Sequence, residues 1–121
     1  MTSIAPWITV ADAAKAVAFY RAAFAATELE RTEDGGGTVI VAHLAIDGAD
    51  FWLQHEPRLD AAQLGGEPIR MILSVDDPDS VYERALDAGA TPITPVYEGH
   101  GWRIGRIADP SGHHWEIGRP L

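Results

Sequence analysis

Cysteine is absent from the 121 residues, and this absence excludes disulfide bonds and metal sites built on thiolates. Basic residues are also scarce, since nine Lys and Arg stand against 18 Asp and Glu, giving a net charge of −9. Such a surface repels phosphate backbones, so we expect no nucleic-acid partner. The negative charge either attracts a cationic ligand over long range or serves solubility alone.

Long hydrophobic runs are missing as well. No apolar stretch approaches the ~20 residues of a membrane span, so we expect no membrane partner. The opening MTSIAPWITV has no basic stretch and no long apolar core, so we expect no signal peptide. Together with the lack of cysteine, these features favour a cytoplasmic protein. The length suits one domain, residues 1–121, with a core that needs no crosslinks.

Two segments have the spacing of amphipathic helices. The segment DAAKAVAFYRAAFAA, residues 12–26, begins at Asp12, a good N-cap, and repeats its large apolar residues at helical intervals. The segment DPDSVYERALDAG, residues 77–89, has an aspartate to cap it, a proline in its first turn and a glycine at its end. One helix is therefore expected in each half of the chain.

The remaining segments alternate between strand and turn patterns. The predicted order is βαβββ, a polar connector, and βαβββ again, which gives an α+β fold made of two modules. We place module one at 4–56, the connector at 57–67 and module two at 68–119. The repeat is visible in GADFWL (48–53) and GHHWEI (112–117), which share the pattern Gly-x-x-aromatic-x-aliphatic at an offset of 64 residues.

This repeat, together with an early V-x-D…A-x-A-F-Y-R…F and a late DPSGHHWEIG, resembles the vicinal oxygen chelate superfamily of glyoxalases, bleomycin-resistance proteins and extradiol dioxygenases. The ending is similar to the DP-x-G-H-x-W of its PhnB-like members. The resemblance implies a curved mixed sheet with helices on its outer face and a cup on its inner face. It also implies a homodimer in which one chain or two chains build each cup.

In the metal-dependent members, the resemblance implies four ligands, one on the first and one on the last strand of each module. Carried over to this sequence, the four positions are Ala5, Trp52, Arg70 and Glu116. Only Glu116 offers a ligand atom that a divalent cation accepts, so we expect no metal cofactor and expect Glu116 to pair with Arg70. The alternative is one divalent ion at a relocated site, since a one-residue slip of register would offer other ligands: His43, Gln54, His55 or His114.

Strand alternation sorts side chains between the cup and the core. If Glu116 faces the cup, then an almost wholly apolar set faces the helices: Ile8, Val10, Phe51, Leu53, Met71, Leu73, Val75, Trp115 and Ile117. An aromatic cavity with a few polar groups is typical of a small-molecule site. The candidate ligand-binding residues are Trp7, His43, Trp52, Gln54, Arg70, Trp102, Arg106, His114 and Glu116. We expect His55, His100 and His113 to lie at the surface.

Three functions are compatible with these features. The first is a metal-independent protein that sequesters an aromatic or cationic small molecule, such as an antibiotic, as the bleomycin-resistance proteins do. The second is an enzyme, a glyoxalase-like lyase or isomerase that uses Glu116 as a base or as a ligand of a relocated metal. The third is a structural or regulatory dimer with an empty cup. The sequence leaves open whether the protein is catalytic.

Overall fold

A computed structural model of the chain describes residues 2–65 and 69–121. The predicted boundary between connector and module two, at 67/68, lies outside these residues. Five elements form the first module: β1 (Trp7–Val10), α1 (Ala13–Phe24), β2 (Thr27–Glu33), β3 (Val39–Ile46) and β4 (Ala49–His55). Its sheet has the order β1-β4-β3-β2, with β1 parallel to β4 and the other neighbours antiparallel.

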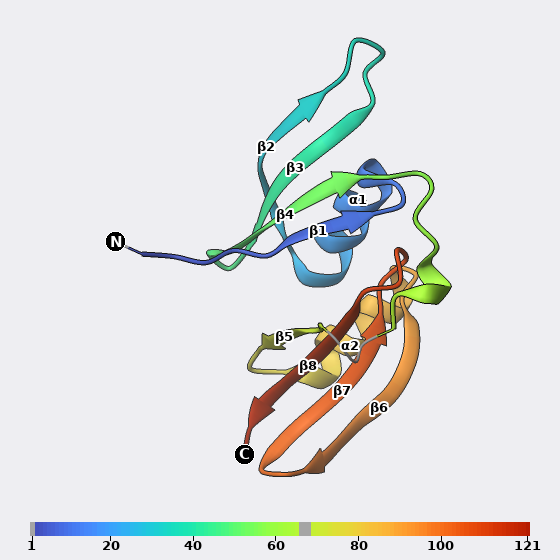
Figure 1. Cartoon of the computed structure of the whole chain (residues 1–121). Coiled ribbons are helices and arrows are strands. Elements are labelled where there is room, and N and C mark those ends of the chain that lie inside the picture. Colours follow the sequence, from blue (N-terminus) through green and yellow to red (C-terminus); the bar gives the residue numbers. More distant parts are fainter. Residues whose placement is uncertain (1, 66–68) are drawn as a thin grey trace.

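The second module repeats this arrangement with β5 (Met71–Ser74), α2 (Pro78–Asp87), β6 (Thr91–Gly99), β7 (Trp102–Ala108) and β8 (His114–Pro120). Its sheet has the order β5-β8-β7-β6 and the same pattern of directions. The predicted α+β fold of two βαβββ modules is confirmed, and hydrogen bonding divides the strands into two four-stranded sheets (Figure 1). A 3₁₀ turn at Ala61–Gln63 in the connector was not predicted from the sequence.

Both predicted helix starts are confirmed. The side chain of Asp12 accepts a hydrogen bond from the backbone N–H of Lys15, and that of Asp77 accepts one from Ser80. These contacts satisfy amide groups that the first turn of a helix leaves without a partner. None of the helices among the described residues is long and apolar enough to cross a membrane.

The structure also confirms the repeat. Gly48 and Gly112 are equivalent positions, and both have a positive φ, 86° and 92°. The pairing of the parallel strands is also equivalent in the two modules. Trp7 pairs with Trp52 in the first sheet, and Ile72 pairs with Glu116 in the second. The modules therefore share one register, and equivalent residues can be compared directly.

One apolar core joins the two modules. The indole of Trp115, on β8, packs at 5.6 Å from the ring of Phe51, on β4, and at 5.0–5.4 Å from Phe24 and Tyr20 of α1. The predicted helix-facing residues of β1, β4 and β8 are all buried. Those on and after β5, Met71, Leu73 and Val75, are only partly buried and pack against this core. Strand alternation leaves the other face of each sheet open, and that face is where the candidate site residues lie.

Candidate ligand-binding site

Four side chains form a row across the open face of the second sheet. Glu116 on β8 pairs laterally with Ile72 on one side and Arg106 on the other, and Arg106 pairs with Thr94 on the edge strand β6. We call these four residues the ionic row. Paired strands bring directly opposite residues within side-chain contact, so this row places a carboxylate and a guanidinium next to each other.

Glu116 forms ion pairs with two arginines through the same oxygen. Its Oε1 lies 2.8 Å from Nη2 of Arg106 and 2.9 Å from Nε of Arg70. The ion pair between Arg70 and Glu116 is therefore as predicted, and Arg106 is a second partner. The side chain of Glu116 is 17% exposed and that of Arg106 is 21% exposed, so this cluster is partly withdrawn from water. Charge-assisted contacts of this kind fix the positions of the charged groups.

Three members of the ionic row, Ile72, Arg106 and Glu116, border a cavity of about 420 Å³, and the lining residues that the structure describes all belong to the second module. Arg70, Arg106 and Glu116 supply its charges, while Tyr97, Trp102 and Ile72 supply flat or apolar walls. The volume falls within the ~300–1,000 Å³ of small-molecule sites. Of the predicted site residues, the structure brings Arg70, Trp102, Arg106 and Glu116 together here.

The first sheet carries the equivalent row, and its chemistry is different. Trp7, Trp52, His43 and Glu30 are successive lateral partners on β1, β4, β3 and β2. We call them the aromatic row. The imidazole of His43 stacks on Trp52 with ring centroids 3.8 Å apart and planes at 5°, and Trp52 stacks on Trp7 at 5.9 Å. Where the second module has two cations on a carboxylate, the first has stacked rings.

Two carboxylates hold the outer end of the aromatic row. The Nε2 of His43 lies 2.8 Å from Asp50, and its Nδ1 lies 3.7 Å from Glu30. The indole N–H of Trp7 donates to Oε1 of Gln54 at 2.9 Å, which fixes the orientation of that ring. The open face of the first module is therefore aromatic and acidic, and Trp7 leaves 54% of its surface exposed.

A smaller pocket of about 210 Å³ lies where the modules meet. Trp7 from the first module lines it together with Arg70 and His114 from the second, and Leu59 and Leu64 of the connector form an apolar wall. Since Arg70 borders both this pocket and the larger cavity, it links the two. Three predicted site residues from different modules thus share one pocket.

Two histidines that we expected at the surface have specific contacts instead. His113 lies with its Nε2 at 2.5 Å from the backbone carbonyl of Thr9, which ties the DPSG turn to β1. His55 accepts a hydrogen bond from the backbone N–H of Ala13 through its Nδ1, at the start of α1. The expectation was wrong for these two because both partners lie far away in the sequence. His100, in contrast, is exposed at the β6–β7 turn.

A sequence model of the glyoxalase-like domain matches residues 7–118. The chain belongs to the glyoxalase-like family. It is 39% identical to an uncharacterized protein of Mycobacterium bovis, Mb0911c, in an alignment covering 98% of this chain and 84% of that protein. The Mycobacterium tuberculosis protein Rv0887c is also 39% identical, over 98% of this chain and 75% of its own length.

Solved structures share the glyoxalase-like fold over nearly the whole chain. The fosfomycin resistance protein FosX of Listeria monocytogenes superposes with a TM-score of 0.79 at 17% identity, covering 99% of this chain and 94% of FosX. TioX of Micromonospora sp. ML1 superposes with a TM-score of 0.74 at 24% identity, covering 99% and 97% of the two chains. At these identities the likeness shows the vicinal oxygen chelate fold and no more.

The residues at the four metal positions of the superfamily do not fit a divalent cation. Ala5 has no ligand atom, Trp52 is stacked between two rings, and Arg70 is ion-paired with Glu116. Glu116 itself has Oε1 engaged by two guanidiniums, whose charge opposes that of a metal ion. Within residues 2–65 and 69–121, no three or more His, Asp and Glu side chains cluster as metal ligands would. Among these described residues, the histidines considered for a relocated site, His43, His55 and His114, belong to no such cluster.

Proposed function

We propose that this glyoxalase-like protein binds a small aromatic molecule without a metal ion. The observation that carries the proposal is the double arginine contact on Glu116, at 2.8 and 2.9 Å, beside a cavity of about 420 Å³. The superfamily position that would hold a metal is committed to two cations instead. Flat apolar surfaces of Trp102 and Tyr97 border the same cavity and offer stacking faces to a ring system.

The proposed binding mode is sequestration, of an antibiotic for example, and the proposed assembly is a homodimer. Opposite charges support the assembly, because the open face of module one carries Glu30 and Asp50 while that of module two carries Arg70 and Arg106. Exposed apolar side chains accompany them, with Trp7 54% and Ile72 60% exposed. Docking these faces from two chains would bury both and would bring the aromatic row against the ionic row.

A glyoxalase-like lyase or isomerase is the second candidate, because Glu116 is a carboxylate that faces a cavity able to hold a substrate. A base must accept a proton within hydrogen-bond reach of the substrate. Both arginines use Oε1, so Oε2 would have to serve that role. Under this candidate, Glu116→Gln abolishes turnover of a substrate that the protein also binds.

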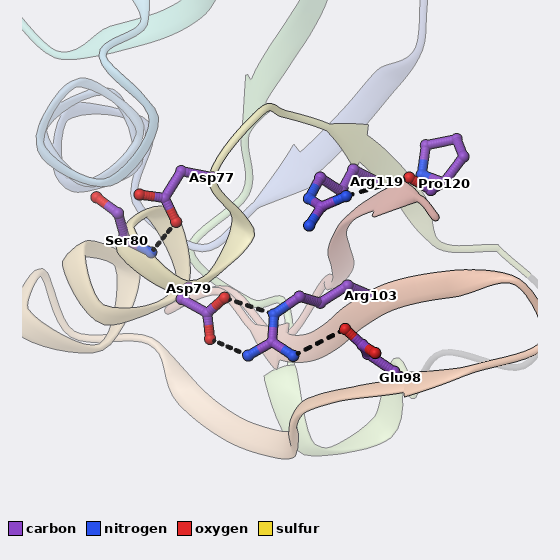
Figure 2. A network of polar contacts seen from close by, with 7 residues as sticks. All are labelled: Asp77, Asp79, Ser80, Glu98, Arg103, Arg119 and Pro120. Atoms are coloured by element: carbon purple, nitrogen blue, oxygen red, sulfur yellow. Dashed lines mark hydrogen bonds and ion pairs between the residues drawn. The ribbon is translucent and has the colours of Figure 1, made fainter.

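Native mass spectrometry of the purified protein, before any metal is added, tests the proposal. We expect a dimer that carries either nothing or a co-purified organic molecule. Trp102→Ala, which removes an aromatic wall of the cavity, should lose that molecule or weaken its binding about tenfold, as expected when one stacking surface disappears. Arg103→Gln is the control, because Arg103 lies on the helix side of β7 and contacts Asp79 (Figure 2). One divalent ion per chain would contradict the proposal.

A further inference from the structure

Strand β6 lies at the edge of the second sheet (Figure 1), and a β-bulge changes which of its side chains face the large cavity. On β7, Ile104 precedes Arg106 by two residues. On β6, their partners Tyr97 and Thr94 are three residues apart. One residue of β6 is therefore extra, as in a β-bulge. Pro95, which lies in this stretch, suits such a place because it has no N–H to give to a neighbouring strand.

The bulge turns Tyr97 toward the cavity. Thr94 faces the same side of the sheet as its partner Arg106, so regular alternation would also point Val96 at the cavity and Tyr97 at the helices. Instead, Val96 packs against the apolar core, and its Cγ2 lies 3.0 Å from the position that a Cβ on Gly105 would occupy. Tyr97 lines the large cavity and stays exposed. The bulge thus adds an aromatic ring to the open face.

Gly99 leaves room for that ring. It lies two residues after Tyr97 and pairs with Trp102, another residue that lines the cavity. A Cβ added to Gly99 would lie 2.8 Å from Cε2 and 3.4 Å from Cδ2 of Tyr97. Gly99 does not have a left-handed φ, so the backbone conformation does not call for glycine here. The close approach of the tyrosine ring does, and one edge of this ring rests against the strand.

Tyr97 stands between two cavities on the open face. On one side it lines the large cavity with Gly99 and Trp102, and on the other it lines a side pocket of about 70 Å³ with Thr94 and Gly105. The other residues that the two cavities share are Ile104, Arg106 and Glu116. Of these four, Tyr97 is the most exposed and the only one on the edge strand. Its ring is therefore the part of the boundary that is most easily altered.

We propose that Tyr97 is the specificity-determining residue of this site, because its ring, resting against Gly99, limits the length of the aromatic ligand that the cavity accepts. This role presupposes the proposed small-molecule function and adds to it the feature that selects ligand size. A ring excludes a ligand atom by van der Waals contact, whatever the charge of the groups around it. Without the ring, the large cavity and the side pocket would form one longer site.

The test uses two uncharged planar probes that differ by one fused ring, naphthalene-2-carboxamide and anthracene-2-carboxamide. Equilibrium dialysis against the full chain, read by probe fluorescence, gives both dissociation constants. Their ratio measures the preference for the longer probe. We expect wild type to bind the anthracene probe no more tightly than the naphthalene probe. If wild type binds the anthracene probe about tenfold more tightly, as full burial of a third ring would allow, Tyr97 does not limit ligand length and the inference is wrong.

Two variants of Tyr97 separate its ring from its hydroxyl. Tyr97→Ala should raise the preference for the anthracene probe about tenfold, because the third ring then extends into the side pocket and buries apolar surface there. Tyr97→Phe restores the ring and should restore the wild-type ratio. An unchanged ratio in Tyr97→Ala, or an equal rise in both variants, would overturn the role of the ring.

A third variant moves the ring without removing it. Gly99→Ala places a methyl group where the edge of the Tyr97 ring lies, so it should also raise the preference for the anthracene probe, by less than Tyr97→Ala does. An unchanged ratio would show that Gly99 does not hold the ring in place. Gly35→Ala is the matched control, because Gly35 also lacks a left-handed φ and has nothing within 4 Å of its added Cβ. It should bind both probes as wild type does.

The outcomes also distinguish the role of Tyr97 from the proposed function. If both probes bind and no variant changes their ratio, the small-molecule function stands and the role of Tyr97 fails. If neither probe binds to wild type or to any variant at its solubility limit, while amide NMR spectra show folded proteins, both proposals fail.

Discussion

The hydroxyl of Tyr20 donates a hydrogen bond to the carboxylate of Asp109, 89 residues further along the chain. Tyr20 belongs to the F-Y-R segment of α1, and Asp109 opens the DPSG turn before β8. Asp109 is 4% exposed and accepts further bonds from the indole N–H of Trp115 and from the backbone of the turn. Two segments that mark the superfamily in the sequence thus meet in the core, where a buried carboxylate needs such donors.

Removing this donor should cost stability. Tyr20→Phe keeps the ring packing and deletes one hydrogen bond to a buried charged group, so we expect the free energy of unfolding to fall by ~1–3 kcal/mol. Urea denaturation followed by tryptophan fluorescence measures the change. Tyr82→Phe is the control, since the Tyr82 hydroxyl makes a long contact of 3.5 Å to the backbone carbonyl of Arg106. Equal stability of Tyr20→Phe and wild type would show that the bond contributes nothing.

The same pair predicts how stability depends on alkaline pH. Burial, and then the charge of Asp109, raise the pKa of Tyr20 well above its usual value of 10.0. The unfolded chain therefore loses this proton first as the pH rises, so the stabilisation is complete below about pH 10 and is lost above it. We expect the stability of wild type to fall between pH 10 and 11 more steeply than that of Tyr20→Phe. Parallel curves for the two proteins would argue against this titration.

Gly112 is predicted to tolerate no side chain. It has a φ of 92°, and an added Cβ would lie 2.4 Å from the carbonyl oxygen of Ala61. Gly112→Ala should therefore lower the free energy of unfolding by more than the ~1–2 kcal/mol of left-handed strain alone. The equivalent Gly48→Ala is a matched control, because Gly48 has a φ of 86° and nothing within 4 Å of its added Cβ. Equal losses in the two variants would mean that the turn shifts away from Ala61.

A second titration involves the contact between α2 and β7. Arg103 donates Nε and Nη2 to the two oxygens of Asp79, both at 2.7 Å, and this hydrogen bonding lowers the pKa of Asp79 below its usual 3.8 (Figure 2). The contact between Asp79 and Arg103 therefore stabilises the fold at a pH above the pKa that Asp79 has in the unfolded chain. This stabilisation is lost as the pH falls through the lower pKa that Asp79 has in the folded protein. Carbon-13 NMR titration of the Asp79 carboxyl should give a low midpoint in wild type. In Arg103→Gln the midpoint should rise, whereas an unchanged midpoint would exclude Arg103 as the cause.

Much of the fold could be predicted because its signals are local or periodic. Asp12 and Asp77 indicate where the helices begin, because aspartate is a preferred N-cap residue. The Gly-x-x-aromatic-x-aliphatic repeat predicts the same register for β4 and β8. That register placed Trp115 and Phe51 in the core and Glu116 beside Arg70. The residues involved are close in the sequence or related by the repeat.

Contacts across long sequence separations were harder to predict. Arg106 was a candidate only as a residue near a hairpin, and its position opposite Glu116 depends on the length of the β7–β8 turn. The contacts of His113 with Thr9, and of Tyr20 with Asp109, span 104 and 89 residues. Their geometry follows from how the two modules pack, which no local pattern encodes.

The aromatic row and the ionic row occupy equivalent positions in two copies of one scaffold, and each has its core residues on the other side of the strand. A change in a row alters what the open face attracts while the packing beneath stays as it was. Trp52 and Glu116 illustrate this: they are equivalent by the repeat, yet one is an aromatic ring and the other a carboxylate. The repeat thus provides two faces of the same geometry with different recognition chemistry on one fold.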